Sequence, residues 1–166
     1  MKIAIVILNW NGKKLLETFL PSIVNFSSEK AEIFVADNAS TDESIFYVKK
    51  HFPSVNIIEN TINGGYAKGY NDALQAVKAN IYCLINSDVE VTENWLSPIL
   101  EVFDTEKNVA IIQPKILDYK DKYSFEYAGA AGGFIDFFGY PYCRGRVFNS
   151  LEKDNHQFDD TTEIFW

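Results

Sequence analysis

Cysteine and histidine are scarce in this 166-residue chain. Its two cysteines, Cys83 and Cys143, supply no disulfide framework, which favours a reducing compartment. Cys83 lies within an apolar run, so we expect a buried thiol there. The histidines, His51 and His156, are far apart in the sequence, and no Cys-x-x-Cys pair accompanies them. A zinc site is therefore not expected, because such sites gather cysteine and histidine ligands.

Long hydrophobic runs are also missing. The first run, Ile3–Leu8, is too short for the core of a signal peptide and ends in the polar stretch "NWNGKK". No run approaches the length of a transmembrane helix. We therefore expect a cytoplasmic protein, and we leave open a peripheral association with the inner face of the membrane.

Positive charge is in the minority, since 15 Lys and Arg residues face 23 Asp and Glu residues, giving a net charge of −8. This balance argues against a nucleic-acid partner. A small anionic ligand remains compatible with it, because a metal ion and backbone N–H groups can hold such a ligand.

Glycine-rich phosphate loops are absent where two enzyme classes would have them. A dehydrogenase would carry Gly-x-Gly-x-x-Gly directly after its first strand, and this chain has "NWNGKK" there. A nucleotidyltransferase usually places a loop rich in Gly and Lys or Arg at the same point. The match is poor, but a nucleotidyltransferase remains an alternative.

The residues that are present alternate between apolar runs and helical patterns. Hydrophobic residues make up 47% of the chain, so we expect a folded domain. The order predicts an α/β fold, with a mostly parallel central sheet and helices on both faces. The predicted strands are Ile3–Leu8, Ile33–Ala36, Val55–Ile58, Ile81–Ile85 and Val109–Ile112. Apolar residues at helical spacing predict helices over 15–24, 45–52, 66–77 and 95–103.

Three local signals refine this pattern. Pro21 lies within the first predicted helix and should kink or split it. "STDE" (residues 40–43) has the pattern of a capping box for the second helix. The chain after Pro114 is rich in Gly and aromatic residues and predicts short strands and loops. Its last four residues, "EIFW", have the pattern of a strand that is beginning, so we expect a fragment.

Polar clusters follow four of the predicted strands, where a parallel sheet binds its ligands. Each has a plain alternative as a turn or a helix cap, and Lys68 as a surface lysine. A glycine-rich helix start such as Gly64-Gly65 is also a ready anion site. The candidate ligand-binding residues are Asn9, Asn11, Asp37, Asn38, Gly64, Gly65, Lys68, Asn71, Asn86, Ser87 and Asp88.

Asp88 has the weakest structural explanation among these residues. It follows the buried strand, beside Asn86 and Ser87, and lies four residues before the next predicted helix begins after Thr92. A carboxylate in this position suits Mg²⁺ or Mn²⁺, which take oxygen ligands and keep positions open for phosphates. We therefore predict that Asp88 is a metal ligand.

Four ordered motifs resemble the family 2 inverting glycosyltransferases with the GT-A fold, and in particular their bacterial rhamnosyltransferase-like branch. They are "VILNWNGKKLLETFLPSI", "VADNASTDES", "NGGYAKGYNDAL" and "CLINSDVEV". Their order and spacing match from residue 3 to about residue 118, and "GGFIDFFGYPYCRGR" resembles the segment that follows. The resemblance implies sugar transfer from a nucleotide-diphosphate sugar to a hydroxyl of a glycan or lipid-linked acceptor, in cell-surface polysaccharide synthesis.

The resemblance also implies a role for each cluster. Asn9 and its neighbours would line the nucleoside pocket, and Asp37 would contact the base. Gly64, Gly65 and Asn71 would flank the nucleotide and the sugar. Asn86-Ser87-Asp88 takes the place of the family's Asp-x-Asp motif, with Asn86 in place of its first acid. The expected cofactor is a divalent cation, Mg²⁺ or Mn²⁺, held by Asp88.

The general base of the family is not matched in this chain. It usually follows further downstream in an acidic motif, and none of Asp118, Asp121, Asp136, Asp159 and Asp160 matches that motif. We therefore assign residues 1–118 to a nucleotide-sugar-binding core and residues 119–166 to an incomplete acceptor-side region, within one structural domain. The expected behaviour is binding of the sugar donor without efficient transfer. A non-catalytic nucleotide-binding module remains an alternative.

Overall fold

The computed structural model describes residues 1–126, 131–160 and 162–164. The chain forms two compact units, Met1–Thr105 and Glu106–Trp166. Each unit is described by itself below. The functional division after residue 118, and the assignment of both parts to one domain, stay predictions.

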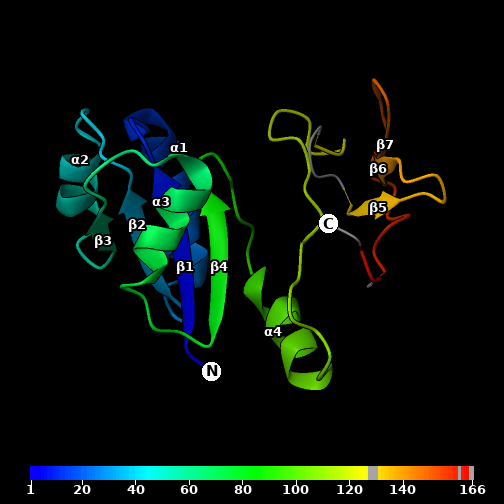
Figure 1. The fold of residues 1–166 in the computed structure, drawn as a ribbon, viewed down its shortest axis with the longest axis horizontal. Coiled ribbons are helices and arrows are strands. Elements are labelled where there is room, and N and C mark those ends of the chain that lie inside the picture. The colour runs from blue at the N-terminus through cyan, green and yellow to red at the C-terminus, as the bar shows by residue number, and fades with distance from the viewer. Residues whose placement is uncertain (127–130, 161, 165–166) are drawn as a thin grey trace. The chain divides into compact units, whose positions relative to one another are not determined.

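The N-terminal unit alternates strands and helices. Its strands form one parallel sheet in the order β3-β2-β1-β4, and all four arrows point the same way in Figure 1. The apolar runs thus predict these four strands correctly, to within one residue at every end. The elements are β1 (Ile3–Asn9), α1 (Lys13–Ser27), β2 (Glu32–Asp37), α2 (Ser44–His51), β3 (Asn56–Glu59), α3 (Gly65–Leu74), β4 (Ile81–Asn86) and α4 (Leu96–Thr105).

Helices cover both faces of this sheet, as predicted. Successive side chains of a strand point to opposite faces, so the buried strand β1 serves two cores at once. Ile5 and Ile7 pack in one core with residues of α1 and α2, whereas Ala4 and Val6 pack in the other with Tyr70 of α3. Figure 1 shows α3 lying across one face of the sheet. Because every strand is parallel, all four deliver their last residues to the same edge.

Two predictions differ from the structure, one for residues 109–112 and one for the first helix. Residues 109–112 form no strand, and Ile111 is 88% exposed. A short apolar run becomes a strand only where a neighbouring strand accepts its backbone hydrogen bonds, and the described sheet has no strand beyond β4. Pro21 lies inside α1 without splitting it, so the split is wrong, while the kink stays a prediction. Leu16, Phe19, Leu20 and Ile23 bury one face of α1, and this packing outweighs the one backbone hydrogen bond that proline cannot donate.

The C-terminal unit contains the short strands that the sequence predicts. They form an antiparallel sheet in chain order: β5 (Gly133–Ile135), β6 (Pro141–Cys143), β7 (Arg146–Val147) and β8 (Ser150–Leu151). Phe125 is completely buried and packs against Phe158. The strand expected in "EIFW" is not seen at residues 163 and 164, and residues 165 and 166 lie outside the described residues. None of the described helices is long and apolar enough to cross a membrane.

Candidate functional site

The ends of the parallel strands bring the predicted polar clusters to one edge of the sheet. Asn9 of β1 is in register with Asp37 of β2, and Asp37 is in register with Glu59 of β3. On the other side of β1, Asn86 of β4 is in register with Leu8. The predicted clusters therefore lie side by side at one edge of the sheet.

Asn9 holds the ends of β1 and β2 together. Its Nδ2 donates to Asp37 Oδ1 at 3.0 Å, to Ser44 Oγ at 3.0 Å and to Ser40 Oγ at 3.2 Å. Asn9 is fully buried, so its amide N–H groups are used inside the chain. Its Oδ1 is buried and has no hydrogen-bond partner among the described residues. A Cβ on Gly12 would lie 2.4 Å from this oxygen, so the turn needs glycine there.

Asp37 is a buried carboxylate in the same network. It is 4% exposed, and its second oxygen, Oδ2, accepts a hydrogen bond of 2.9 Å from the backbone N–H of Ser40. This bond closes the turn after β2, as the alternative explanation of Asp37 predicts. Each carboxylate oxygen has a second lone pair, so Asp37 keeps the capacity to accept from a ligand.

The predicted capping box of α2 is wrong, because its serine bonds elsewhere. Ser40 Oγ accepts from the backbone N–H of Asn11 at 2.8 Å, and α2 begins only at Ser44. Asn11 Oδ1 in turn accepts from the backbone N–H groups of Thr41 at 2.7 Å and Asp42 at 3.2 Å. Asn11 therefore ties the loop after β1 to the loop after β2. Local sequence suggests a cap, but the partner of Ser40 lies 29 residues away.

Asp42 caps the starts of two helices, although it is not among the candidate residues predicted from the sequence. Its Oδ2 accepts from the backbone N–H of Lys13 in α1, and its Oδ1 accepts from the backbone N–H of Ser44 in α2, each at 3.0 Å. Partial burial raises the pKa of Asp42, but the hydrogen bonds from Ser44 and Lys13 outweigh it and lower the pKa below 3.8. The sequence signal for this cap is the position of Asp42, an acidic residue three positions before the predicted helix over 45–52.

Asn38 joins β2 to the loop before α3. Its Nδ2 donates to Asn63 Oδ1 at 2.8 Å and to the backbone oxygen of Gly65 at 3.2 Å, and its Oδ1 accepts from Asn60 at 3.2 Å. Asn38 is buried, so these bonds fix the loop from inside. The helix passes so near that a Cβ on Gly69 would lie 3.0 Å from the Asn38 amide.

The glycine pair opens α3 as predicted. Gly65 has φ +79°, a conformation that favours glycine, and its N–H donates to Asn63 Oδ1 at 2.9 Å. Lys68 and Asn71 are exposed on this helix. The ammonium of Lys68 pairs with Asp72 at 2.6 Å, one helical turn onward.

A pocket of about 230 Å³ lies at the end of β4. It is lined by Leu8, Tyr66, Asn86, Ser87 and Asp88. The structure thus gathers the three predicted residues of the "NSD" motif around one hollow. Tyr66 opens the helical pattern that predicts residues 66–77, but its side chain is 63% exposed.

Asp88 suits the role of a single protein ligand to a divalent cation whose other ligands come from elsewhere. Its carboxylate is exposed in the loop after β4 and lines the pocket. Among the described residues, no pair of further carboxylate, imidazole or thiol groups gathers with it. Asp88 therefore fits an ion such as Mg²⁺ or Mn²⁺, whose other ligands are phosphate and water oxygens.

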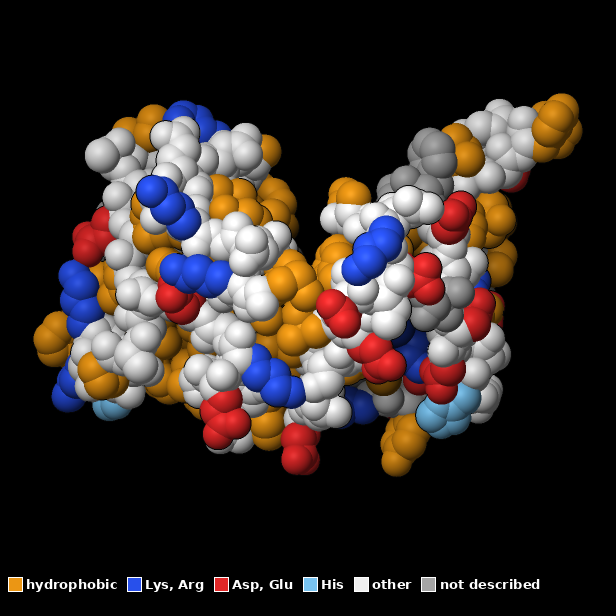
Figure 2. All heavy atoms as spheres, turned by 90° about the horizontal axis from the view of Figure 1, so that it is seen from below, with side chains coloured by type: hydrophobic (Ala, Val, Ile, Leu, Met, Phe, Trp, Pro, Cys, Tyr) orange, Lys and Arg blue, Asp and Glu red, His pale blue; other side chains and the backbone are white. Residues whose placement is uncertain are grey.

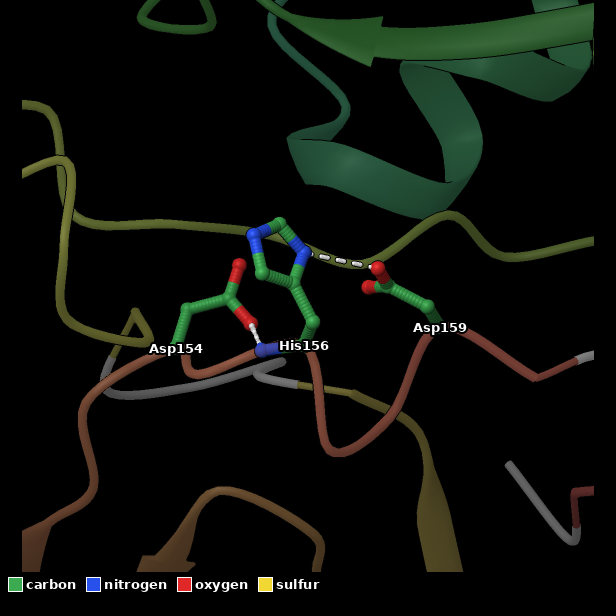
Figure 3. Close-up of side chains that lie close together, drawn as sticks. All are labelled: Asp154, His156 and Asp159. Atoms are coloured by element: carbon green, nitrogen blue, oxygen red, sulfur yellow. Dashed lines mark hydrogen bonds and ion pairs between the residues drawn. The ribbon is translucent and has the colours of Figure 1, made fainter.

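A second group of titratable residues lies in the C-terminal unit. Figure 2 shows acidic side chains gathered on a face of that unit, and Figure 3 shows His156 between Asp154 and Asp159. One ligand atom from each lies within 4.8 Å of the others, so His156 is distant from His51 in the sequence but lies beside two carboxylates in the fold. However, Lys115 Nζ already lies 2.7 Å from Asp154 and 2.6 Å from Asp159. The lysine compensates both carboxylates, which explains the cluster without a metal ion.

Sequence comparison finds relatives that are named glycosyltransferases. At 37% identity over 94 residues, a poly(ribitol-phosphate) β-glucosyltransferase of Bacillus spizizenii matches 53% of the chain and 15% of its own length. An uncharacterized glycosyltransferase of Bacillus subtilis is 28% identical over 130 residues, which is 76% of the chain and 32% of that protein. The chain thus spans less than a third of either relative.

The fold also has solved counterparts. Staphylococcus aureus TarS, residues 1–349 in complex with UDP-GlcNAc, superposes with a TM-score of 0.57 at 21% identity, over 71% of this chain and 39% of TarS 1–349. This likeness supports the GT-A fold. The sequence profile described as "Glycosyl transferase family 2" matches residues 4–159, almost the whole chain. The chain therefore belongs to glycosyl transferase family 2.

Proposed function

We propose that this chain forms the sugar-donor-binding part of an inverting glycosyltransferase. The observation that carries the proposal is the pocket at the end of β4, in which Asp88 lies beside Asn86 and Ser87. The strand ends beside it supply Asp37 and the loop that opens α3. One sheet edge therefore offers the Asp37 carboxylate to contact the nucleobase, the start of α3 to bind phosphates and the Asp88 carboxylate to hold a cation.

Each predicted residue then has a physical role. Asp37 accepts from the nucleobase, while Asn9, Asn11 and Asn38 fix the loops around it. Gly64, Gly65, Lys68 and Asn71 face the diphosphate and the sugar from α3. Asp88 holds Mg²⁺ or Mn²⁺, with Asn86 and Ser87 as polar neighbours. The bound ion neutralises the charge that develops on the departing nucleoside diphosphate.

The reaction we propose is a single in-line displacement. The oxygen of the acceptor hydroxyl bonds to the anomeric carbon while the bond from that carbon to the diphosphate oxygen breaks, so the configuration inverts. The hydroxyl proton passes to a general base. We assign this base to no residue of the chain. The chain should accordingly bind the sugar donor and transfer little.

The resemblance extends the proposal to partners and location. The acceptor is a glycan or a lipid-linked glycan, and the product serves cell-surface polysaccharide synthesis. TarS has been solved with UDP-GlcNAc, which supports a nucleotide sugar as the donor class. We place the reaction in the cytoplasm, with the protein peripheral at the inner face of the membrane.

Isothermal titration calorimetry tests the proposal directly. UDP, dTDP and GDP are titrated into the chain with and without Mn²⁺, and then into Asp88→Asn and the matched control Glu93→Gln. We expect one nucleotide to bind in a Mn²⁺-dependent way, to lose that dependence in Asp88→Asn and to keep it in Glu93→Gln. Failure of all three nucleotides to bind the folded chain would overturn the proposal. Binding without transfer by a chain extended to the length of its relatives would favour a non-catalytic nucleotide-binding module.

A further inference from the structure

Tyr66 displays an aromatic ring in the pocket of the "NSD" motif. The residue is 63% exposed, although it lies in the first turn of α3. It lines the same hollow as Asn86, Ser87 and Asp88, and Leu8 is the other apolar side chain there. An exposed ring next to a polar motif has a wet edge for hydrogen bonds and an apolar face for packing.

The ring of Tyr66 is held in place by the ring of Tyr70. Tyr66 packs edge-on against Tyr70, with ring centroids 5.0 Å apart and planes at 72°. Tyr70 is 3% exposed, and its hydroxyl donates to the backbone oxygen of Ile85 at 2.8 Å. Ile85 directly precedes the "NSD" motif, so one hydrogen bond links the support of the ring to that motif. A ligand that meets a ring already fixed in this way loses less conformational freedom on binding.

We infer that Tyr66 packs against the transferred sugar of the donor. This inference rests on the proposed function, in which Asp88 holds the cation of the diphosphate. The sugar is bonded directly to that diphosphate, so it lies within a few bonds of the cation. Asp37, the proposed contact for the base, belongs to β2 on the far side of β1. Tyr66 therefore meets the sugar end of the donor rather than the nucleobase.

The chemistry of a pyranose suits such a ring. One face of the sugar presents several C–H groups, and these pack on an aromatic face while the hydroxyls remain free for polar partners. Leu8 extends the apolar part of the lining, and Asn86, Ser87 and Asp88 supply the polar part. Tyr66 thus strengthens the binding of the nucleotide sugar and not that of the free nucleoside diphosphate.

The test compares a nucleotide with its own sugar conjugate. The tightest binder among UDP, dTDP and GDP is titrated by calorimetry with Mn²⁺ into the chain, Tyr66→Phe and Tyr66→Ala. The same nucleotide is then used as UDP-glucose, dTDP-glucose or GDP-mannose. We expect Tyr66→Ala to bind the sugar conjugate about tenfold more weakly and the free nucleotide within about twofold. Tyr66→Phe keeps the ring and should bind both as the unchanged chain does.

A control variant and two contrary outcomes complete the test. Phe46→Ala removes another exposed ring, on α2, and should change neither affinity. Equal weakening of both ligands in Tyr66→Ala would overturn the inference and assign the ring to the nucleotide. An unchanged affinity for the conjugate would overturn it as well. Absence of nucleotide binding in the unchanged chain would instead contradict the proposed function itself, so the two failures are distinguishable.

Discussion

The side-chain amide of Asn9 donates a hydrogen bond of 3.0 Å to the carboxylate of Asp37. Both residues are buried, and they end neighbouring strands in register. No described Lys or Arg forms an ion pair with Asp37, so neutral donors alone stabilise its carboxylate. The carboxylate that we assign to base recognition is thus positioned by a residue that does not itself reach the solvent.

Replacing Asn9 tests this dependence. Asn9→Ala removes the amide that serves Asp37, Ser40 and Ser44, and it leaves a buried carboxylate with one donor fewer. We expect the free energy of unfolding to fall by about 3 kcal/mol, since loss of a partner exposes the full desolvation penalty of a buried charged group. Urea denaturation followed by circular dichroism measures it. Asn71→Ala, an exposed asparagine of α3, should change it by less than about 0.5 kcal/mol. Equal effects of both variants would contradict the role of Asn9.

Tyr70 offers a test of the support beneath the pocket. Burial raises the pKa of its hydroxyl, so the group stays protonated and donates to Ile85 throughout the physiological range. Tyr70→Phe keeps the ring and removes this bond, which should lower the free energy of unfolding by about 1 kcal/mol. Tyr47→Phe is the matched control, because no described residue accepts from its hydroxyl. A Tyr70→Phe variant as stable as the control would show that the bond is dispensable.

Asp72 would compete with a phosphate at the start of α3 for the ammonium of Lys68. Their ion pair is exposed and thus weak, so a phosphate can displace Asp72 from the ammonium. In calorimetric titration with the nucleotide that binds, we expect Lys68→Met to weaken affinity by about fivefold, and Asp72→Asn to tighten it by about twofold. Lys14→Met, an exposed lysine of α1, serves as the control. Unchanged affinity in Lys68→Met would remove Lys68 from the proposed site.

The lysine bridge of the C-terminal unit should make its stability dependent on pH. The hydrogen bond from Lys115 lowers the pKa of Asp154 and of Asp159 below 3.8, and His156 adds to the effect on Asp159. Groups with a lowered folded-state pKa stabilise the fold above their unfolded value, and this contribution is lost as the pH falls through the folded pKa. The loss should therefore occur below about pH 4.

Carboxylate titration by NMR checks this prediction. In the unchanged chain the midpoints of Asp154 and Asp159 should lie below 3.8, and in Lys115→Met both should move upward. Burial alone would lower the pKa of Lys115, but its two carboxylate partners outweigh burial and raise it. Lys153→Met should leave both midpoints where they are. If the titration midpoints of Asp154 and Asp159 are the same in Lys115→Met as in the unchanged chain, the bridge does not form in solution.

Sequence patterns by themselves determined the framework of the N-terminal unit. Apolar runs mark β1, β2, β3 and β4, because buried parallel strands are apolar on both faces. Parallel order then forces the polar residues that follow each strand onto one edge. The same reasoning failed at residues 109–112, because a run of apolar residues does not reveal whether a partner strand is within reach.

Only the tertiary structure decided what each polar or aromatic side chain does at that edge. Asn9 turns inward, Tyr66 turns outward, and Ser40 bonds to Asn11 rather than to its own helix. His156 meets Asp159, and both Asp154 and Asp159 meet Lys115, about forty residues earlier in the chain. Hydrogen bonds and ion pairs act over a few ångströms and are indifferent to sequence separation. Their partners are therefore fixed by the folded arrangement of the loops, which local periodicity does not encode.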